Sequence, residues 1–209
     1  MKHSILTATL ALALTSIAPA AIVYNNGTPN NFYGNIAGVA HADYFTLNQA
    51  LSFNTIRVWI GDISDGGFSG DLGWAIWTDD TGLPGSILHS GADNAPTSSD
   101  SGIEFNSGRN YLQVDIDTGS VDLNAGNYWL QIHENAIGQT GDGSNAFWAF
   151  SSSSGNYAVE PDEVNLENWR IEPNGSFAFQ LIQTTSVPEP TSTTLIGLAS
   201  LTLIFRRRR

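Results

Sequence analysis

Residues 111–117 read YLQVDID, and residues 127–134 read NYWLQIHE. In both segments an apolar side chain occupies every second position. Successive side chains of a β-strand point to opposite faces of the sheet, so this period of two predicts two strands that each bury one face. The predicted core residues of these strands are Leu112, Val114, Ile116, Tyr128, Leu130 and Ile132.

Similar alternating segments recur along the chain and are separated by Gly, Asn, Asp and Pro. Residues 79–85 (DDTGLPG) and 124–126 (NAG) are typical of turns, because Gly and Asn accept a positive φ and proline fixes a corner. No window has a helical period. We therefore expect an all-β fold, an antiparallel β-sandwich of jelly-roll type. The expected strands are residues 44–47, 55–60, 73–78, 87–90, 111–117, 127–134, 146–151, 169–171 and 177–183.

The charge of the central region excludes several classes of partner. Residues 21–187 contain three arginines and nineteen acidic residues, which gives this region a formal charge of -16. A surface of this kind repels phosphate groups, so nucleic acid and anionic lipid are poor partners. The chain has no cysteine, which excludes disulfides, thiol catalysis and thiolate metal sites.

The first twenty residues have the three parts of a Sec-type signal peptide. A short basic region that contains Lys2 precedes an apolar stretch at residues 5–17, and Ala18-Pro19-Ala20 is a small-residue cleavage site. We expect the Sec machinery to export the chain and cleavage to follow Ala20, with Ala18 and Ala20 as the recognised pair. The alternative is an N-terminal anchor helix, for which the apolar run is short.

The other end of the chain predicts a membrane segment. Residues 194–205 are mostly apolar and are followed by four arginines. As a helix, residues 191–205 would measure about 22 Å, which is shorter than a hydrocarbon core of about 30 Å, so the arginines are expected to extend toward the headgroups. Arginines resist translocation, which keeps them in the cytoplasm and the domain outside. The four are Arg206, Arg207, Arg208 and Arg209.

Directly before this segment stands Val187-Pro188-Glu189-Pro190, an extended and solvated peptide that a protease can grip. This peptide, the apolar stretch and the arginine cluster together resemble the PEP-CTERM sorting signal. The resemblance implies recognition by an exosortase, an intramembrane cysteine protease, and release to the cell surface or an exopolysaccharide matrix. The alternative is a single-pass anchor that is never cleaved. The expected organisation is a signal peptide at residues 1–20, a β-sandwich domain at 21–186 and a sorting signal at 187–209.

Parts of the domain also resemble the β-sandwich cargo found ahead of many PEP-CTERM tails. The matching phrases are WTDDTGLPG at residues 77–85, AGNYWL at 125–130 and FAFQL at 177–181. This resemblance implies a fold and a location, and it implies no reaction.

Clustered aspartates suggest calcium as a cofactor. Carboxylate oxygens on glycine-rich loops are the ligands that Ca²⁺ requires, although no EF-hand pattern is present. The alternative is that these aspartates are solvated turn residues. The candidate ligands are Asp62, Asp65, Asp71, Asp79 and Asp80.

Two tryptophans suggest a carbohydrate-binding face. Trp59 and Trp129 occupy non-core positions of their strands, and Gln131 and His133 share a face with Trp129. The flat face of a sugar stacks on an aromatic ring while polar neighbours bind its hydroxyls. In the alternative interpretation, loops or a second sheet cover the tryptophans.

Catalytic motifs are weak in this chain. His133-Glu134 begins like the zinc-protease motif, but Ile137 stands where the second histidine is required. Asp115 and Asp117 share a strand face and could approach the carboxylate spacing of about 5 to 10 Å that glycosidases use. We expect a non-enzymatic surface or matrix protein associated with exopolysaccharide. The alternatives are a secreted polysaccharide-active enzyme and a purely structural envelope protein.

Overall fold

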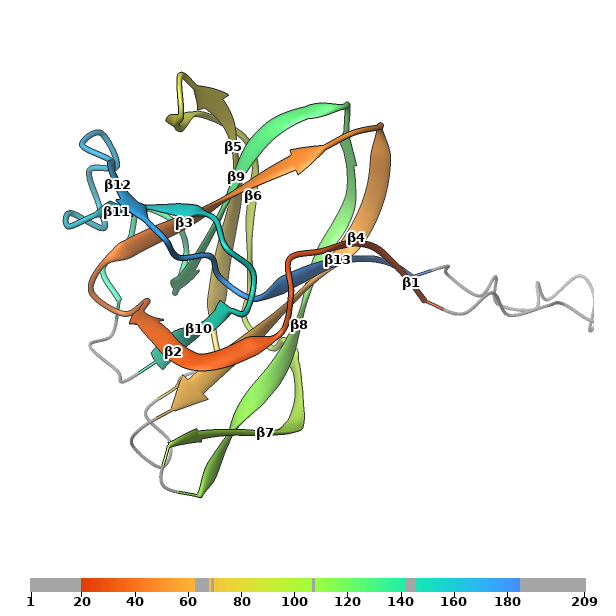
Figure 1. Cartoon of the computed structure of the whole chain (residues 1–209), viewed down its shortest axis with the longest axis vertical. Coiled ribbons are helices and arrows are strands. Elements are labelled where there is room, and N and C mark those ends of the chain that lie inside the picture. The colour runs from red at the N-terminus through yellow and green to blue at the C-terminus, as the bar shows by residue number, and fades with distance from the viewer. Residues whose placement is uncertain (1–19, 63–67, 69, 107, 142–145, 185–209) are drawn as a thin grey trace, which may run out of the picture. The chain divides into compact units, whose positions relative to one another are not determined.

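The computed structural model describes residues 20–62, 68, 70–106, 108–141 and 146–184, which form two antiparallel sheets (Figure 1). In this part of the chain no helix is long and apolar enough to cross a membrane. The seven-stranded sheet contains β1 (Ala21–Asn25), β2 (Pro29–Asn35), β4 (Leu51–Asp62), β7 (Thr97–Asn106), β8 (Arg109–Leu123), β10 (Ala146–Ser151) and β13 (Phe179–Gln183). The six-stranded sheet contains β3 (Ala40–Leu47), β5 (Leu72–Asp80), β6 (Leu83–Asp93), β9 (Gly126–Glu134), β11 (Asn156–Glu160) and β12 (Arg170–Pro173).

The long strand β4 organises the seven-stranded sheet. One edge of β4 pairs with β8, which in turn pairs with β7. Its other edge pairs first with β13 and then with β10. β13 in turn pairs with β1, and β10 pairs with β2. The six-stranded sheet has the order β12-β11-β3-β9-β5-β6. All of these pairings are antiparallel, so the predicted all-β class is confirmed.

The inner faces of the two sheets share one core. Val114 and Ile116 of β8 and Leu130 and Ile132 of β9 are fully buried there, as their alternation predicted. Leu112 and Tyr128 are half-buried and pack against the same cluster. One core between two packed sheets is the arrangement of a β-sandwich.

The outer faces are also partly covered, which the strand pattern did not predict. On the six-stranded sheet, Trp77 and Trp129 lie among small alanines and under the segment that connects β11 to β12. Trp169 of that segment meets Trp77 edge-on, with ring centroids 5.6 Å apart. On the seven-stranded sheet, Trp59 lies in a second outer cluster with Phe105 of β7.

The predicted turn between β5 and β6 is confirmed. β5 ends at Asp80 and β6 begins at Leu83, which leaves a two-residue loop. Thr81 has a φ of 53° and Gly82 a φ of 90°. A two-residue hairpin loop with both central residues at positive φ matches the right-handed twist of its strands.

Candidate functional site

The predicted sugar-binding side chains on β9 are not open to solvent, so the expectation of an exposed stacking face there is wrong. Trp129 is 1% exposed, and Gln131 and His133 are fully buried. Residues 161–169 cover this face, and Glu163 Oε2 lies 3.1 Å from His133 Nε2. The alternative in which a loop covers the aromatic face is the one observed.

Trp59 is buried in the same way on the other sheet. Its side chain is 5% exposed and contacts a cluster that includes Phe105 and Tyr111. Phe105 comes from the edge strand β7, which pairs with β8 and was not among the expected strands. Period-two alternation separates the two faces of a strand, but it cannot indicate that both faces are buried.

The predicted calcium ligands do not gather into one cluster in the described part of the chain. There, no three His, Asp or Glu side chains are grouped as metal ligands. Asp79 accepts the indole N–H of Trp129 at 2.9 Å, and Asp80 is exposed beside the hairpin turn. Asp65 lies outside the described residues. Asp62 and Asp71 flank that stretch and each has an interaction of its own, so calcium binding stays a prediction.

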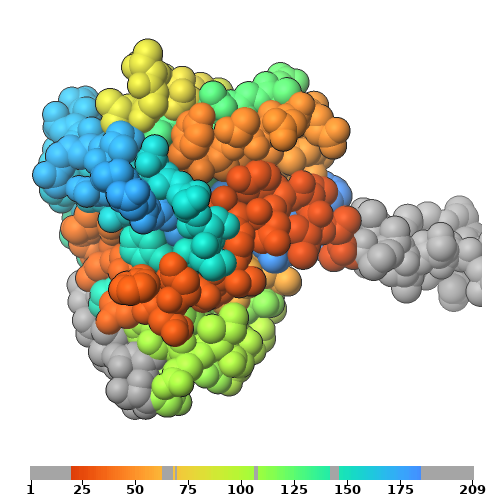
Figure 2. Space-filling model, viewed as in Figure 1, coloured from red at the N-terminus to blue at the C-terminus, as the bar shows by residue number. Residues whose placement is uncertain are grey.

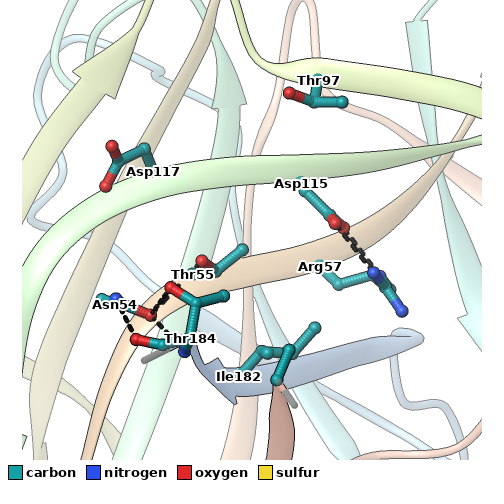
Figure 3. Close-up of a pocket in the computed structure, with 9 residues that line it drawn as sticks. Asn54, Thr55, Arg57, Thr97, Asp115, Asp117, Ile182 and Thr184 are labelled. Carbon is teal, nitrogen blue, oxygen red and sulfur yellow. Dashed lines mark hydrogen bonds and ion pairs between the residues drawn. The ribbon is translucent and has the colours of Figure 1, made fainter. Parts of the chain in front are cut away.

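A polar pocket of about 330 Å³ lies on the outer face of the seven-stranded sheet (Figure 3). Arg57 spans both oxygens of Asp115, with Nε to Oδ1 at 2.7 Å and Nη2 to Oδ2 at 2.8 Å. Asp117 stands apart from this pair and points away from it in Figure 3. Arg57 therefore binds the carboxylate of Asp115 in a bidentate manner. A glycosidase would need this carboxylate to be available to its substrate.

The same pocket contains the last described residue of the chain. Asn54 donates its side-chain N–H to the carbonyl oxygen of Thr184 at 2.9 Å. Its Oδ1 accepts the backbone N–H of Thr184 at 2.8 Å and the hydroxyl of Thr184 at 2.9 Å (Figure 3). The amide of Asn54 therefore continues the strand pairing of β13 by one residue and fixes the point where the chain leaves the sheet.

A second pocket, of about 490 Å³, lies where the chain passes between the two sheets, and we call it the edge pocket. β2 contributes one wall, the residues after β10 another, and the ends of β11 and β12 complete it. In Figure 2 the surface of β2 adjoins the surface of the residues that follow β10. The lining includes Asn30, Phe32, Phe150, Tyr157 and Asn174, with the serine run 151–154.

Phe150 and Tyr157 line the edge pocket, and buried aromatic rings pack behind Phe150. The centroids of Phe150 and Phe177 lie 4.4 Å apart, and those of Phe177 and Trp148 lie 4.3 Å apart, both pairs in a stacked arrangement. Tyr157 meets Phe150 edge-on at 5.1 Å. Packed rings of this kind hold one another in place, so the wall is preformed.

Residue 175, at the rim of the edge pocket, must be glycine because the backbone there lies against two aromatic rings. A Cβ added there would lie 2.7 Å from Cε1 of Tyr157 and 2.8 Å from Cε1 of Phe150. Its neighbour Asn174 has a φ of 65°, a conformation that asparagine tolerates better than most residues. The Asn-Gly turn thus brings the backbone against the two rings.

Ser151, which lines the edge pocket, is hydrogen-bonded to a buried polar cluster. The hydroxyl of the buried Ser151 donates to the carbonyl oxygen of Asn26 at 2.5 Å. Asn26 Nδ2 in turn donates to Asp43 Oδ2 at 2.5 Å, and the hydroxyl of Ser176 donates to the same oxygen at 3.0 Å. Burial raises the pKa of Asp43 well above its ordinary value, although these hydrogen bonds act in the opposite direction.

Sequence reasoning missed the edge pocket, although some signals of it were present. Asn174-Gly175 and the serine run 151–154 are sequences that are typical of turns. Phe32 sits in a stretch rich in Asn, Gly and Pro, which has no alternation and was not expected to form a strand. Only the fold shows that these distant segments meet.

The two ends of the described domain lie side by side. β1 pairs with β13, with Ala21 opposite Gln183, at one side of the sheet (Figure 1). The predicted cleavage site after Ala20 directly precedes β1. Of the predicted cleavage pair, Ala20 belongs to the described residues and Ala18 lies outside them. The sorting peptide, from Val187 to Pro190, and the arginines 206–209 also lie outside.

Comparison with protein families identifies the tail. Residues 186–209 match the model of the PEP-CTERM protein-sorting motif. The comparison with curated proteins returned no match. The resemblance stated from the sequence is therefore confirmed, and the chain carries the C-terminal sorting motif of an exosortase substrate.

Proposed function

We propose that this chain is a non-enzymatic exported protein that an exosortase releases from its membrane tail to the cell surface or the extracellular matrix, where it associates with exopolysaccharide. The observation that carries the proposal is the match of residues 186–209 to the PEP-CTERM sorting motif. The motif implies export and a surface or membrane-associated location. Cleavage of the tail and the matrix role are the parts that we add.

The arrangement of the two ends supports this proposal. Cleavage after Ala20 would start the mature chain directly at β1, whose partner β13 leads to the tail. Only Thr185 and Ser186 separate the residue fixed by Asn54 from Val187. Both processing events would therefore occur at one pole of the sandwich, and the opposite surfaces would be left for partners.

The charge of the domain supports a soluble matrix protein. A net charge of -16 over residues 21–187 favours self-repulsion and disfavours anionic surfaces. After removal of both the signal peptide and the arginine cluster, Arg57, Arg109 and Arg170 would be the only lysine or arginine residues left. The released domain would then be repelled by anionic lipid headgroups and free to join a neutral matrix.

The proposal is tested by mass spectrometry of the mature protein recovered from its native cells. We expect an N-terminus at Ala21 and a C-terminus that lacks Arg206 to Arg209, in the surface or matrix fraction. A variant with Pro188→Ala and Pro190→Ala should keep its tail in the membrane fraction. Pro161→Ala, in an exposed loop of the domain, is the matched control and should be processed normally. Recovery of the wild-type protein in the cytoplasm, or with its arginines in place, would contradict the proposal.

The matrix role is tested separately. Treatment of the matrix with polysaccharide-degrading enzymes should release the mature protein into the medium. If the protein instead stays with the cell envelope after the polymer is removed, the structural envelope alternative is favoured. Turnover of the polymer by the purified protein would favour the enzyme alternative.

A further inference from the structure

The edge pocket carries an exposed aromatic ring, Phe32, which belongs to none of the three hydrophobic clusters of the described domain. Phe32 on β2 is 72% exposed, more than any other large apolar side chain in the described part of the chain. Its backbone is nevertheless fixed, because its N–H donates to Asn30 Oδ1 at 3.1 Å and its carbonyl oxygen accepts the hydroxyl of Tyr111 at 3.3 Å. An exposed ring on a held backbone beside a preformed pocket is a feature of binding surfaces.

The polar part of the pocket is made of neutral groups that both donate and accept hydrogen bonds. Ser152, Ser153 and Ser154 are exposed along one side, and Asn174 is exposed on another. Hydroxyl and amide groups complement the hydroxyls of a sugar, which are also donors and acceptors. An aromatic ring with such neighbours is suited to a sugar, whose C–H face needs an apolar surface and whose edge needs polar partners.

The electrostatics of the pocket select against anions. The residues that line the pocket carry no charge, in a domain with a formal charge of -16. In the sheet register Tyr157 is paired with two acids, Glu172 on β12 and the buried Asp43 on β3. Burial first, and Glu172 second, raise the pKa of Tyr157, so this tyrosine stays a neutral hydrogen-bonding group. A uronic acid or sulfated sugar would meet repulsion from Glu172 and from the domain as a whole.

We infer that the edge pocket binds a neutral sugar ring of a polysaccharide, with Phe32 as the stacking surface and with Asn174 and the serines 152–154 as its hydrogen-bonding partners. This inference rests on the proposed matrix function and gives that function a site and a ligand class. A volume of about 490 Å³ lies within the range of small-molecule pockets, which is about 300 to 1,000 Å³. The site therefore accommodates a short stretch of polymer.

The inference is tested with the full-length protein in a detergent whose headgroup is polyoxyethylene, because sugar headgroups would compete. Affinity electrophoresis through gels that contain dextran, galactomannan or hydroxyethyl cellulose measures neutral ligands, and alginate serves as the polyanion. We expect retardation by at least one neutral polymer and none by alginate. Phe32→Ser should weaken that binding about tenfold, which corresponds to the loss of an aromatic contact of about 1.4 kcal/mol.

Leu88→Ala is the matched control, because Leu88 is an exposed apolar residue on the edge strand β6 and does not line the pocket. It should bind as the wild type does. Binding to none of the neutral polymers, tighter binding to alginate, or equal binding by Phe32→Ser and the wild type would each overturn the inference.

Fractionation of the same variants in cells separates this inference from the proposed function. Phe32→Ser should be exported and lose its tail as the wild type does, and should then leave the matrix more readily. If the wild type is processed and reaches the surface but binds no neutral polymer, the inference fails and the sorting proposal stands. If the wild type is not processed, the sorting proposal fails while the binding measurement remains valid.

Discussion

His41 and Asp43 are two titratable residues on the inner face of β3, where most neighbouring side chains are apolar. The ring of His41 lies 5.2 Å from that of Phe177, and Asp43 accepts hydrogen bonds from Asn26 and Ser176. Burial disfavours the charged form of each group, so it lowers the pKa of the histidine and raises that of the carboxyl. Their contributions to the pH dependence of stability therefore have opposite signs.

The histidine should make the domain sensitive to acid. Burial lowers the pKa of His41 from 6.5 to about 4. The unfolded chain therefore takes up a proton below pH 6.5 that the folded chain refuses until about pH 4, and the free energy of unfolding falls by roughly 3 kcal/mol across this window. His41→Gln should remove this fall in urea titrations between pH 7 and pH 4. His89→Gln, on the edge strand β6, is the control and should keep it. An unchanged pH slope in His41→Gln would contradict the assignment.

Asp43 should act in the other direction. Because its folded-state pKa is raised, the folded protein keeps a proton that the unfolded chain releases above pH 3.8. The stabilisation is present below that pH and is lost as the pH rises toward the folded-state pKa, by at most about 1.4 kcal/mol per pH unit. Asp43→Asn cannot ionise, so its unfolding free energy should rise relative to the wild type as the pH increases. Asp80→Asn, exposed at the hairpin, should track the wild type. Parallel curves for Asp43→Asn and the wild type would refute this prediction.

At the scale of elements, the strands with an alternating core face, such as β4, β8 and β9, are among those that the sequence predicts. β8 and β9 follow their alternation closely, and β13 begins at Phe179, two residues later than expected. The strands that it misses include β1, β2 and β7, which lie at edges of the seven-stranded sheet and are largely exposed. An edge strand held mainly by backbone hydrogen bonds needs no apolar period, so composition such as PNNFYGN in β2 gives no strand signal.

The loop between β12 and β13 provides a test of how tightly an element is packed against the edge pocket. In Gly175→Ala the new methyl group would collide with Tyr157 and Phe150, at 2.7 and 2.8 Å from their ring carbons. We expect a loss of about 1 to 3 kcal/mol in unfolding free energy, because the two rings are held by their neighbours. Gly38→Ala, where a Cβ meets nothing within 4 Å, should change stability by about 0.5 kcal/mol or less. Equal stability of the two variants in urea denaturation would show that the rings move aside freely.

At the scale of the whole molecule, the sorting tail could be predicted from sequence and the edge pocket could not. The tail is a contiguous signal, in which proline-flanked Glu189, an apolar run and Arg206 to Arg209 follow one another. The edge pocket is assembled from residues near positions 30, 150 and 174, which are brought together by long-range strand pairing. The burial of Trp59 and Trp129 is equally a property of the assembled fold, since β7 and residues 161–169 cover them.

We expect the hydrogen bonds between Asn54 and Thr184 to influence the proposed processing of the tail. Val187 follows Thr184 after only two residues, which span about 7 Å when extended. A protease that grips the sorting peptide must therefore work close to the folded sheet. Release of Thr184 would lengthen the free peptide and ease access.

The variant Asn54→Ala tests whether removal of the tail depends on the hydrogen bonds between Asn54 and Thr184. Loss of the hydrogen bonds to the backbone of Thr184 should cost about 1 kcal/mol locally, which corresponds to about fivefold faster hydrogen exchange at the Thr184 amide. In cells, a pulse-chase time course should show faster loss of the tail. Thr97→Ala, which lines the same pocket from β7, is the control and should be processed at the wild-type rate. If Asn54→Ala speeds exchange but leaves the rate of tail removal unchanged, the exosortase grips its peptide without need of slack from the domain, and the proposed coupling between fold and processing is absent.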